Sequence, residues 1–435
     1  MMNTLKAVRG TRDLLPPETN LWNHVEATAR AVLARYGFGE IRTPIFEATE
    51  LFVRGVGEET DVVAKEMYTW DDRARAASEK PQQLTLRPEN TAGVVRAYIE
   101  HKLGDTGNLQ KLFYIGPQFR RERPQRGRYR QFWQIGAEVI GPPSSGAESA
   151  VRDAEVLEML ASLLDELGVK GWRLALNSVG SASDRPRYVA ALKAALQPVK
   201  ASLCVDCQRR AETNSLRVLD CKVPEDQAAI NALPRIADFL DEGSTNHFAQ
   251  VRDALDACGV AYTLEPRLVR GLDYYTRTTF EFTVPTSADA GSGLGTQNAL
   301  LGGGRYDGLS EMLGGPKAPG IGFAIGEDRL LLTLQAQASA SFATKFDAYL
   351  APLGVAQNAA ALALARDLRR AGLSIEVGDG SFRLKKSFAT AEGLARHIVL
   401  LGDDEVASGM LTVKTFATGE QKKINREALA GALRA

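Results

Sequence analysis

Residues 268–282, with the sequence LVRGLDYYTRTTFEF, bring together side chains that could do chemistry. The second half of this segment alternates polar and apolar residues, as a half-buried strand does. The first half collects groups that build no ordinary core: Arg270, Asp273, Tyr274 and Tyr275. A guanidinium, a carboxylate and two phenols at the entrance of one strand indicate a polar binding site.

The segment FRRERPQRGRYRQF, residues 119–132, carries six arginines around a turn marked by proline and glycine. Arg120, Arg128 and Arg130 have the alternate spacing that places side chains on one strand face. Phe132 continues that parity if the two flanking strands are in register. Guanidinium groups pair with phosphate oxygens and an aromatic ring stacks on a base, so the pattern favours a nucleotide site on a sheet. A solvated, charged hairpin is the alternative.

Two further segments carry polar residues at expected helix starts. In GIGFAIGEDRLLL, residues 320–332, a strand runs through glycine into a helix with Arg329 in its first turn. Read alone, this arginine would be a surface residue. In TLRPENTAGVVRAYIEH, residues 85–101, Glu89 and Thr91 stand at a helix start, where a simple N-terminal cap is the ordinary interpretation.

The composition limits the class of protein. The chain has 435 residues, enough for two or three domains, and its 53 basic and 53 acidic residues give a formal net charge of zero. No global field would attract a polyanion, so any such site must be a local patch. The chain has only four cysteines, its N-terminus lacks the apolar stretch of a signal peptide, and no run is long enough to span a bilayer. We expect a cytoplasmic protein without membrane segments.

Apolar periodicity predicts helices and strands in the larger, N-terminal part. Helical spacing marks residues 19–37, where Gly37 would end the helix, and residues 151–167. Residues 112–140 favour two strands around the arginine-rich turn. Residues 298–306 favour another strand.

The rest of the chain predicts three further regions. Residues 185–262 are largely helical in pattern and read as an insertion, and the glycine-rich residues 291–295 favour a hairpin. Residues 335–344 form a small polar linker without periodicity. Beyond them, strand and helix patterns alternate and are followed by a hairpin at residues 410–424. This order predicts a compact α/β domain with a mainly parallel sheet over residues 345–435.

These segments together resemble one family, the histidyl-tRNA synthetases, which are class II aminoacyl-tRNA synthetases. Class II enzymes carry three motifs, and the candidates here are ARYGFGEIRTPIFE (34–47), the arginine hairpin extended through WQIGAEVIG (119–141), and GIGFAIGEDRLLL. Two more motifs are peculiar to histidine-specific members, and both are present: RGLDYYTRTTFEF and LLGGGRYDGL (300–309). The resemblance covers nearly the whole chain.

The resemblance implies an α+β fold, with a class II antiparallel-sheet catalytic domain at residues 1–334 that includes the helical insertion at 185–262. A linker at 335–344 would lead to an α/β anticodon-binding domain at 345–435. The implied reaction is the ATP-dependent ligation of L-histidine to tRNA(His) through a histidyl-adenylate, which releases pyrophosphate and AMP. The resemblance also implies a homodimer with the first motif at its interface, and a bacterial type.

Two other functional classes are alternatives. The regulatory subunit of ATP phosphoribosyltransferase is a non-catalytic paralogue with the same fold, but it typically lacks the terminal domain and has degraded histidine-specific motifs. A general RNA-binding protein would use the arginine hairpin alone. Histidine-dependent pyrophosphate exchange separates both from a synthetase.

The resemblance assigns catalytic roles to two arginines. In the family, Arg270 corresponds to a residue beside the α-phosphate and the substrate carboxylate, and Arg120 to one that also grips the α-phosphate. Phe132 and Arg329 match the residues that sandwich adenine, and Arg128 matches one that reaches the outer phosphates. Positioned cations suit this chemistry because negative charge concentrates at the reacting phosphorus. The expected cofactors are ATP and Mg²⁺, with the ion held largely by the nucleotide.

The resemblance also implies a histidine pocket. Its expected residues are Glu89, Thr91, Gln134, Glu138, Tyr275 and Tyr306. Glu138 and Tyr275 would face the two ring nitrogens, because a neutral imidazole has one donor and one acceptor. Glu89, Thr91 and Gln134 match positions that hold the α-amino group. Asn90 departs from the family pattern, since small residues are common at its place.

The cysteines of CVDCQRRAETNSLRVLDCK, residues 204–222, are predicted to be reduced structural thiols, and no metal ligand is assigned. Zinc at Cys204, Cys207 and Cys221 is the less favoured alternative, because a tetrahedral site needs a fourth ligand and a second CxxC is absent. Four basic residues of the same segment could touch the acceptor arm of a tRNA or lie on a solvated helix face. They are Arg209, Arg210, Arg217 and Lys222.

Overall fold

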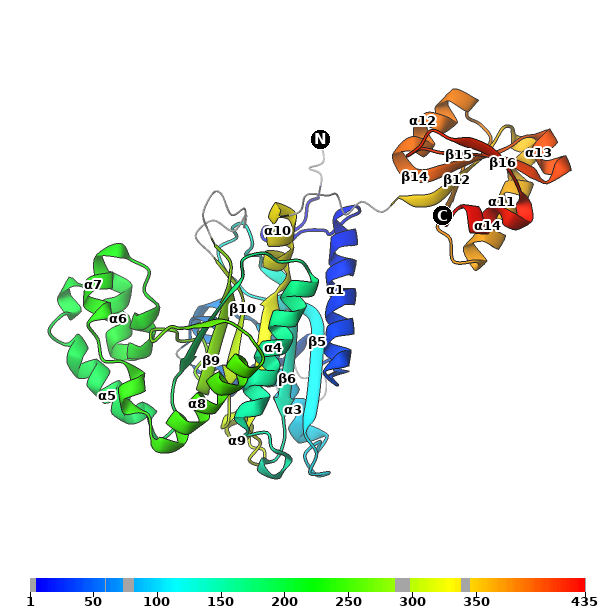
Figure 1. Ribbon diagram of the computed structural model, residues 1–435. Coiled ribbons are helices and arrows are strands. Elements are labelled where there is room, and N and C mark those ends of the chain that lie inside the picture. Colours follow the sequence, from blue (N-terminus) through cyan, green and yellow to red (C-terminus); the bar gives the residue numbers. More distant parts are fainter. Residues whose placement is uncertain (1–4, 59, 73–81, 286–297, 338–344, 435) are drawn as a thin grey trace, which may run out of the picture. The chain divides into compact units, whose positions relative to one another are not determined.

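The computed structural model describes residues 5–58, 60–72, 82–285, 298–337 and 345–434. The chain divides into two compact units, Met1–Ser341 and Phe342–Ala435, and each is described by itself (Figure 1). The glycine-rich hairpin predicted at 291–295 lies outside the described residues. Within the described part, no helix has the length and apolar character that crossing a bilayer requires.

An eight-stranded sheet forms the centre of the first unit, in the order β1-β5-β6-β11-β10-β9-β7-β8. Its strands are β1 (Gly39–Glu40), β5 (Gln110–Phe119), β6 (Gln131–Ile140), β7 (Arg173–Ser178), β8 (Tyr262–Leu264), β9 (Thr276–Thr283), β10 (Ala299–Arg305) and β11 (Gly320–Gly326). Neighbours are antiparallel except at the two edges, where β1 joins β5 and β8 joins β7 in parallel. The two strands predicted around the arginine-rich turn are confirmed as β5 and β6.

Four helices cover one face of this sheet and share its main hydrophobic core (Figure 1). They are α1 (Glu18–Arg35), α4 (Ala150–Glu166), α8 (Glu242–Ala257) and α10 (Glu327–Gln337). In α1, Leu21, Val25 and Val32 recur at helical spacing and are buried against the core. The helix ends before Gly37, whose φ of +79° favours glycine, as the sequence predicted. Because α10 continues to Gln337, the predicted linker begins too early at residue 335.

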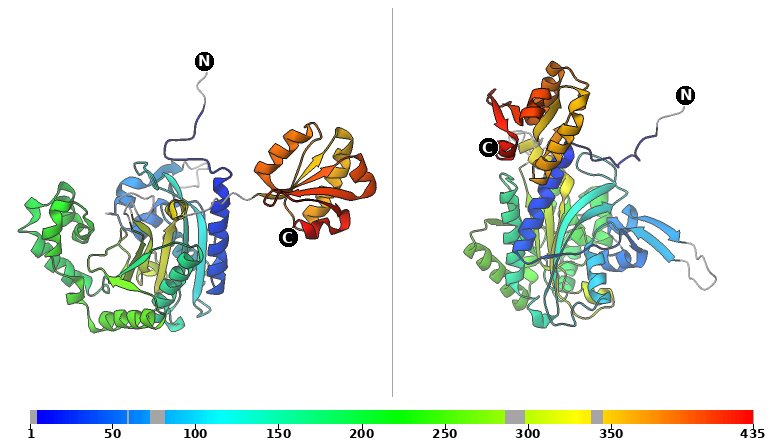
Figure 2. Two further views of the ribbon diagram at one scale, coloured as in Figure 1. Left: turned by 45° about the horizontal axis from the view of Figure 1, so that its top comes forward. Right: turned by 90° about the vertical axis from the view of Figure 1, so that its right-hand side faces the viewer.

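Smaller elements stand on the other side of the first unit. A three-stranded sheet has the order β2-β4-β3, and helices α2 and α3 pack together beside it (Figure 2). The bounds are β2 (Phe46–Ala48), β3 (Tyr68–Asp72), β4 (Gln82–Leu86), α2 (Thr49–Val56), a π-helical turn (Val62–Glu66), α3 (Thr91–Glu100) and α9 (Leu309–Met312). Val95 and Tyr98 of α3 join a second core that extends into the insertion.

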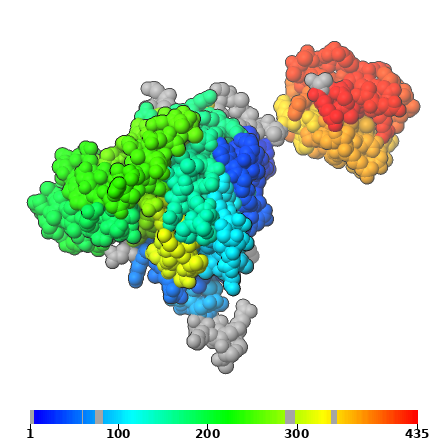
Figure 3. Space-filling view, turned by 60° about the horizontal axis from the view of Figure 1, so that its bottom comes forward, coloured from blue at the N-terminus to red at the C-terminus, as the bar shows by residue number. Residues whose placement is uncertain are grey.

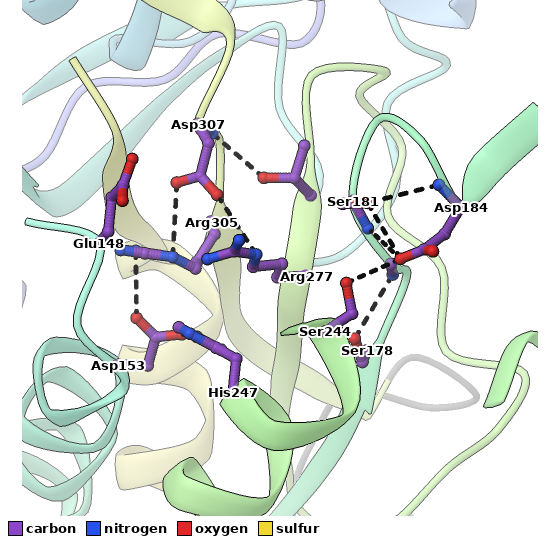
Figure 4. Close-up of polar contacts among 12 residues, drawn as sticks. Glu148, Asp153, Ser178, Ser181, Asp184, Ser244, His247, Arg277, Arg305 and Asp307 are labelled. Atoms are coloured by element: carbon purple, nitrogen blue, oxygen red, sulfur yellow. Dashed lines mark hydrogen bonds and ion pairs between the residues drawn. The ribbon is translucent and has the colours of Figure 1, made fainter. Parts of the chain in front are cut away.

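Short helices between β7 and α8 form a lobe beside the main sheet (Figures 1 and 3). They are α5 (Arg185–Leu196), α6 (Val205–Thr213), α7 (Gln227–Asn231) and 3₁₀ turns at Lys200–Ser202, Ser215–Asp220, Pro224–Asp226 and Ile236–Phe239. Asp184 fastens the entry and exit of this lobe: its carboxylate accepts from Ser181 N, Asp241 N and Ser244 Oγ at 2.7–2.9 Å (Figure 4). The lobe is therefore tied at its base to the sheet and to α8.

A buried charge network holds the end of β10 against the helices (Figure 4). Arg305, which is fully buried, lies 3.4 Å from Asp153 of α4 and 3.5 Å from Asp307. Asp153 also contacts His247 of α8 at 2.8 Å, and Arg305 donates to Ala147 O at 3.0 Å. Since buried charges need partners, these contacts fix the strand end from which Tyr306 projects.

The second unit has a five-stranded sheet in the order β13-β12-β14-β15-β16, with helices around it. Its elements are β12 (Phe346–Pro352), α11 (Asn358–Arg370), β13 (Ile375–Val377), α12 (Leu384–Leu394), β14 (Ala395–Leu401), α13 (Asp403–Ser408), β15 (Met410–Thr415), β16 (Gln421–Asn425) and α14 (Arg426–Ala432). The prediction of a mainly parallel sheet is wrong, because β14, β15 and β16 pair antiparallel while β12 pairs in parallel with β13 and β14. The final hairpin adds two strands without crossovers, and only a crossover produces parallel pairing.

Candidate active site

A pocket of about 500 Å³ opens on the main sheet of the first unit. Its floor comes from β6, β10 and β11, and its walls come from the π-helical turn at Val62–Glu66, the loop before β9 and the helical lobe. The expected binding residues that line it are Glu89, Thr91, Arg120, Arg128, Phe132, Gln134, Arg270, Tyr275, Tyr306 and Arg329. Segments far apart in the sequence thus converge on one cavity.

Arg270 lies in the loop before β9 and crosses the glycine-rich strand β10. Its Nη1 contacts Glu281 Oε2 at 2.6 Å. A Cβ on Gly302 would clash with the guanidinium, so glycine is required for this close approach. The buried Nε has no hydrogen-bond partner among the described residues, which leaves a donor for a ligand.

The arginine hairpin contributes Arg120 and Arg128 to the pocket, whereas Arg130 is not among the residues that line it. The Arg120 guanidinium stands 5.3 Å from the centre of the Phe132 ring, and its Nε donates to Pro88 O at 2.9 Å. Arg128 Nη1 lies 3.2 Å from a Glu122 carboxylate oxygen. The side chain of Arg130 packs on Gly10 of the N-terminal segment.

Arg329 enters the pocket from the first turn of α10. Its Nε donates to Gly127 O and its Nη1 to Ala299 O, each at 3.3 Å. The two carbonyls belong to the hairpin turn and to β10, so they fix the plane of the guanidinium across both segments. A planar cation held in this way can stack on a base. Read alone, the residue would have been placed on the surface, and that interpretation is wrong.

Glu138 is fully buried and, unlike the other expected binding residues, does not line the pocket; it lies behind the lining residues Thr91 and Tyr306. Thr91 Oγ1 and Tyr306 OH each donate to its carboxylate at 2.7 Å. Burial raises the pKa of Glu138 to about 8, against the opposing effect of these two hydroxyl donors. A Cβ on Gly322 would clash with the carboxylate, so β11 must carry glycine here.

Glu89 and Gln134 provide further oxygen atoms to the pocket. The Glu89 carboxylate accepts from Thr91 N at 2.7 Å and Ala92 N at 3.0 Å, so it caps α3 as expected. Gln134 Oε1 is buried and has no hydrogen-bond partner among the described residues, which makes it available to a ligand amine. Asn90, the departure from the family pattern, instead accepts from Thr43 Oγ1 at 2.7 Å.

Tyrosine rings enclose this end of the pocket. The rings of Tyr274 and Tyr275 are 4.7 Å apart, and Tyr274 meets Tyr306 edge-on at 5.9 Å. Tyr114 also lines the pocket beneath Gly136, where a side chain would clash with its ring. Burial raises the pKa of each of these phenols, so they stay neutral hydrogen-bonding groups at physiological pH.

Sequence reasoning missed the residues that the helical lobe contributes. Arg210, Arg217 and Asp220 line the pocket, although the two arginines were expected on a solvated face or against tRNA. Arg217 approaches Asp61 of the π-helical region at 3.9 Å, which brings the lobe across the cavity. This contact depends on the insertion folding over the mouth of the pocket. No local sequence pattern indicates it.

Two models of known protein families together match nearly the whole chain. The family model described as histidyl-tRNA synthetase matches residues 10–330, and one described as an anticodon binding domain matches residues 347–435. The chain belongs to the histidyl-tRNA synthetase family. The class II fold expected for this family is confirmed, with a mixed, largely antiparallel catalytic sheet and a terminal α/β anticodon-binding unit.

Individual histidyl-tRNA synthetases agree with this membership. A histidine–tRNA ligase of Koribacter versatilis is 67% identical over 98% of this chain and 95% of its own length. One from Solibacter usitatus is 53% identical over 99% of both chains. The crystal structure of the apo S. aureus histidyl-tRNA synthetase superposes with a TM-score of 0.78, at 36% identity over 99% of this chain and 100% of that one.

Proposed function

We propose that the pocket activates L-histidine with ATP and then transfers the histidyl group to tRNA(His). Family membership makes the chain a histidine–tRNA ligase, and the proposal concerns which residues perform the reaction. The observation that carries it is the convergence of guanidinium groups, the buried carboxyl of Glu89 and buried phenols on one cavity. The paralogue alternative fits less well, because both histidine-specific motifs and the terminal unit are present.

In the first step, a carboxylate oxygen of histidine attacks the α-phosphorus of ATP, and the bond to pyrophosphate breaks. Arg270 and Arg120 neutralise the charge that builds up on the phosphoryl oxygens. Glu281 holds the guanidinium of Arg270 in place before the substrate arrives, which limits reorganisation during the reaction. Phe132 and Arg329 hold the adenine between them, and Arg128 binds the outer phosphates.

The imidazole of histidine lies between Glu138 and Tyr275. Thr91 and Tyr306 orient the Glu138 carboxylate, and each of its oxygens retains a lone pair for a ligand N–H. The unpartnered Gln134 Oε1, with Glu89 and Thr91, receives the α-amino group. An amino acid without ring nitrogens would leave these buried groups unpaired, which disfavours it strongly.

Mg²⁺ is expected on the phosphate oxygens of ATP, where it neutralises charge on the leaving pyrophosphate. Glu66 and Glu122 line the pocket, and burial followed by the nearby Glu122 raises the pKa of Glu66. A cation between these carboxylates and the phosphates would relieve that repulsion.

In the second step, a hydroxyl of the terminal ribose of tRNA(His) attacks the carbonyl carbon, and AMP leaves. The second unit belongs to the anticodon-binding fold and would read the tRNA.

A homodimer is proposed because Ile45, Phe46 and Trp70 expose apolar surface near the first motif. A monomeric mass in solution would contradict the dimer. We expect the enzyme to work in the cytoplasm.

ATP–pyrophosphate exchange with each of the twenty amino acids tests the proposal. Histidine alone should support exchange, without tRNA, and aminoacylation should require tRNA(His). A non-catalytic paralogue or an RNA-binding module would show no exchange with any amino acid. Exchange driven by another amino acid would contradict the assignment of the Glu138 pocket.

A further inference from the structure

Four potential metal ligands meet in the helical lobe, outside the pocket. The sulfur atoms of Cys204, Cys207 and Cys221 and a carboxylate oxygen of Asp226 all lie within 4.8 Å of one another. Cys204 precedes α6 and Cys207 lies in its first turn, while Cys221 precedes, and Asp226 ends, the 3₁₀ turn at Pro224–Asp226. Cys207, Cys221 and Asp226 are each less than 5% exposed.

The separations fit a single tetrahedral ion. Zinc–sulfur bonds of about 2.3 Å at tetrahedral angles place two sulfurs about 3.8 Å apart. Cys204 Sγ and Cys221 Sγ are 3.9 Å apart, and Cys221 Sγ is 3.3 Å from Asp226 Oδ2. A [4Fe–4S] cluster would hold its cysteine sulfurs farther apart, because each one binds a different iron.

The backbone positions these ligands before any ion arrives. Cys204 N donates to both carboxylate oxygens of Asp226 at 3.1 Å, and Val223 N donates to Cys221 Sγ at 3.4 Å. Gln227 Nε2 donates to the carbonyls of Cys221 and Val223, each at 2.9 Å. N–H groups directed at sulfur and carboxylate favour the ionised ligand forms that a metal requires.

Asp226 supplies the strongest argument for a cation. Its carboxylate is buried, yet no ion pair joins it to a basic side chain in the part of the chain that the structure describes. Hydrogen bonds from Cys204 N partly offset the burial of this carboxylate beside three thiols, and a positive charge would offset it further. A divalent ion would provide that charge and bind all four groups at once.

We propose that the helical lobe binds one structural Zn²⁺ through Cys204, Cys207, Cys221 and Asp226. On binding, the three thiols release their protons to water and become thiolates, while the carboxylate binds as it stands. All four coordination positions are filled by protein, so the ion has no open position for a substrate. It is separate from the Mg²⁺ expected on ATP.

The ion would stabilise one wall of the pocket. α6 carries both Cys207 and the pocket residue Arg210, and the turn that precedes Cys221 carries Arg217. From the same segment, Asn214 Nδ2 donates to Asp273 Oδ1 at 3.1 Å, next to the loop of Arg270. Loss of zinc should therefore loosen this wall and lower thermal stability.

Metal analysis of the purified full-length chain tests the inference. We expect about one zinc ion per chain after dialysis, and a loss to near the background of the measurement in Cys207→Ser and Asp226→Asn. Cys258→Ser removes the exposed cysteine outside the cluster and should keep the zinc. Zinc absent from the parent chain, or retained in both cluster variants, would overturn the site.

A second measurement needs no variant and therefore does not depend on their folding. A thiol reagent should modify one cysteine of the native chain, Cys258, and four after a strong chelator is added. Cobalt(II) added to the chelated chain should develop the charge-transfer absorption of thiolate ligands. Reactivity that is insensitive to metal, or a mass two daltons low from a Cys204–Cys221 disulfide, would contradict zinc binding. Neither result would bear on histidine activation by the pocket.

Discussion

Three neighbouring residues fix the position of the Glu138 carboxyl. Thr91 and Tyr306 donate to it, and Gly322 leaves the space that it occupies. Burial raises the pKa of Glu138 to about 8, so a ligand N–H that favours the ionised form would bind more strongly as the pH rises toward that value. This couples proton release to histidine binding.

Glu138→Gln should raise the KM for histidine by about 10- to 100-fold, because a hydrogen bond to a charged acceptor is lost. The KM for ATP should stay nearly constant, since ATP binds through other residues. Steady-state pyrophosphate exchange measures both constants. An unchanged KM for histidine would remove Glu138 from the recognition of the ring.

At the scale of elements, strands β10 and β11 need glycine at the positions where the side chains of other residues cross them. Gly302 accommodates Arg270, and Gly322 accommodates Glu138. Both strands are hydrogen-bonded to neighbours on each side, so they cannot shift to make room.

Gly322→Ala should therefore abolish most histidine activation while the chain stays folded. The new methyl group would displace the Glu138 carboxylate from Thr91 and Tyr306. Gly39→Ala is the matched control, since a Cβ on this other strand glycine has no atom within 4 Å. Exchange assays and circular dichroism on both variants check the prediction, which fails if the two retain equal activity.

Helix α10 begins with a buried carboxyl that should make stability depend on pH. Both oxygens of Glu327 are buried without hydrogen-bond partners among the described residues, and burial, followed by Glu26 and Asp328, raises its pKa to about 9. The folded chain then holds a proton that the unfolded chain loses above its ordinary pKa near 4.5, so this group lowers stability progressively from about pH 4.5 to 9.

Glu327→Met should gain stability over the parent chain as the pH rises from about 5 to 9. At pH 5 the difference should be smallest, because the unfolded chain has only begun to lose the proton that the folded chain keeps. Thermal unfolding midpoints across this range provide the measurement. A difference that does not vary with pH would show that Glu327 is not neutral in the folded chain.

Helices and strands with a long, regular apolar pattern could be predicted from sequence. Very short strands, and contacts between residues far apart in the sequence, could not. The helices α1 and α4 and the hairpin β5–β6 lie where apolar spacing predicted them. The two-residue β1 is too short for periodicity to mark it. Asp226 joins the cysteine cluster only through the fold of the lobe, just as Arg217 reaches the pocket only across it.

At the scale of the whole chain, activation and tRNA reading belong to separate units. The pocket residues all lie in the first unit, and the second unit has its own hydrophobic core. A unit with its own core can be removed without exposing the core of the other.

Removal of residues 345–435 should spare histidine-dependent pyrophosphate exchange but weaken the charging of tRNA(His). The expected change is a higher KM for tRNA, because the anticodon contacts are lost while the pocket is intact. Exchange and aminoacylation assays on the same preparation separate the two effects. Normal charging by the shortened chain would mean that this unit does not read the anticodon.

The most direct test of the whole account is the pyrophosphate exchange rate of Arg270→Ala. We predict a loss of about 10²- to 10³-fold, because a preorganised cation at the α-phosphate is removed. Arg209→Ala, which removes an exposed arginine of the lobe, should exchange at the parent rate. Both variants should keep the parent's unfolding midpoint and tRNA affinity. An Arg270→Ala chain that exchanges pyrophosphate normally would contradict the central claim that this guanidinium neutralises charge as histidyl-adenylate forms.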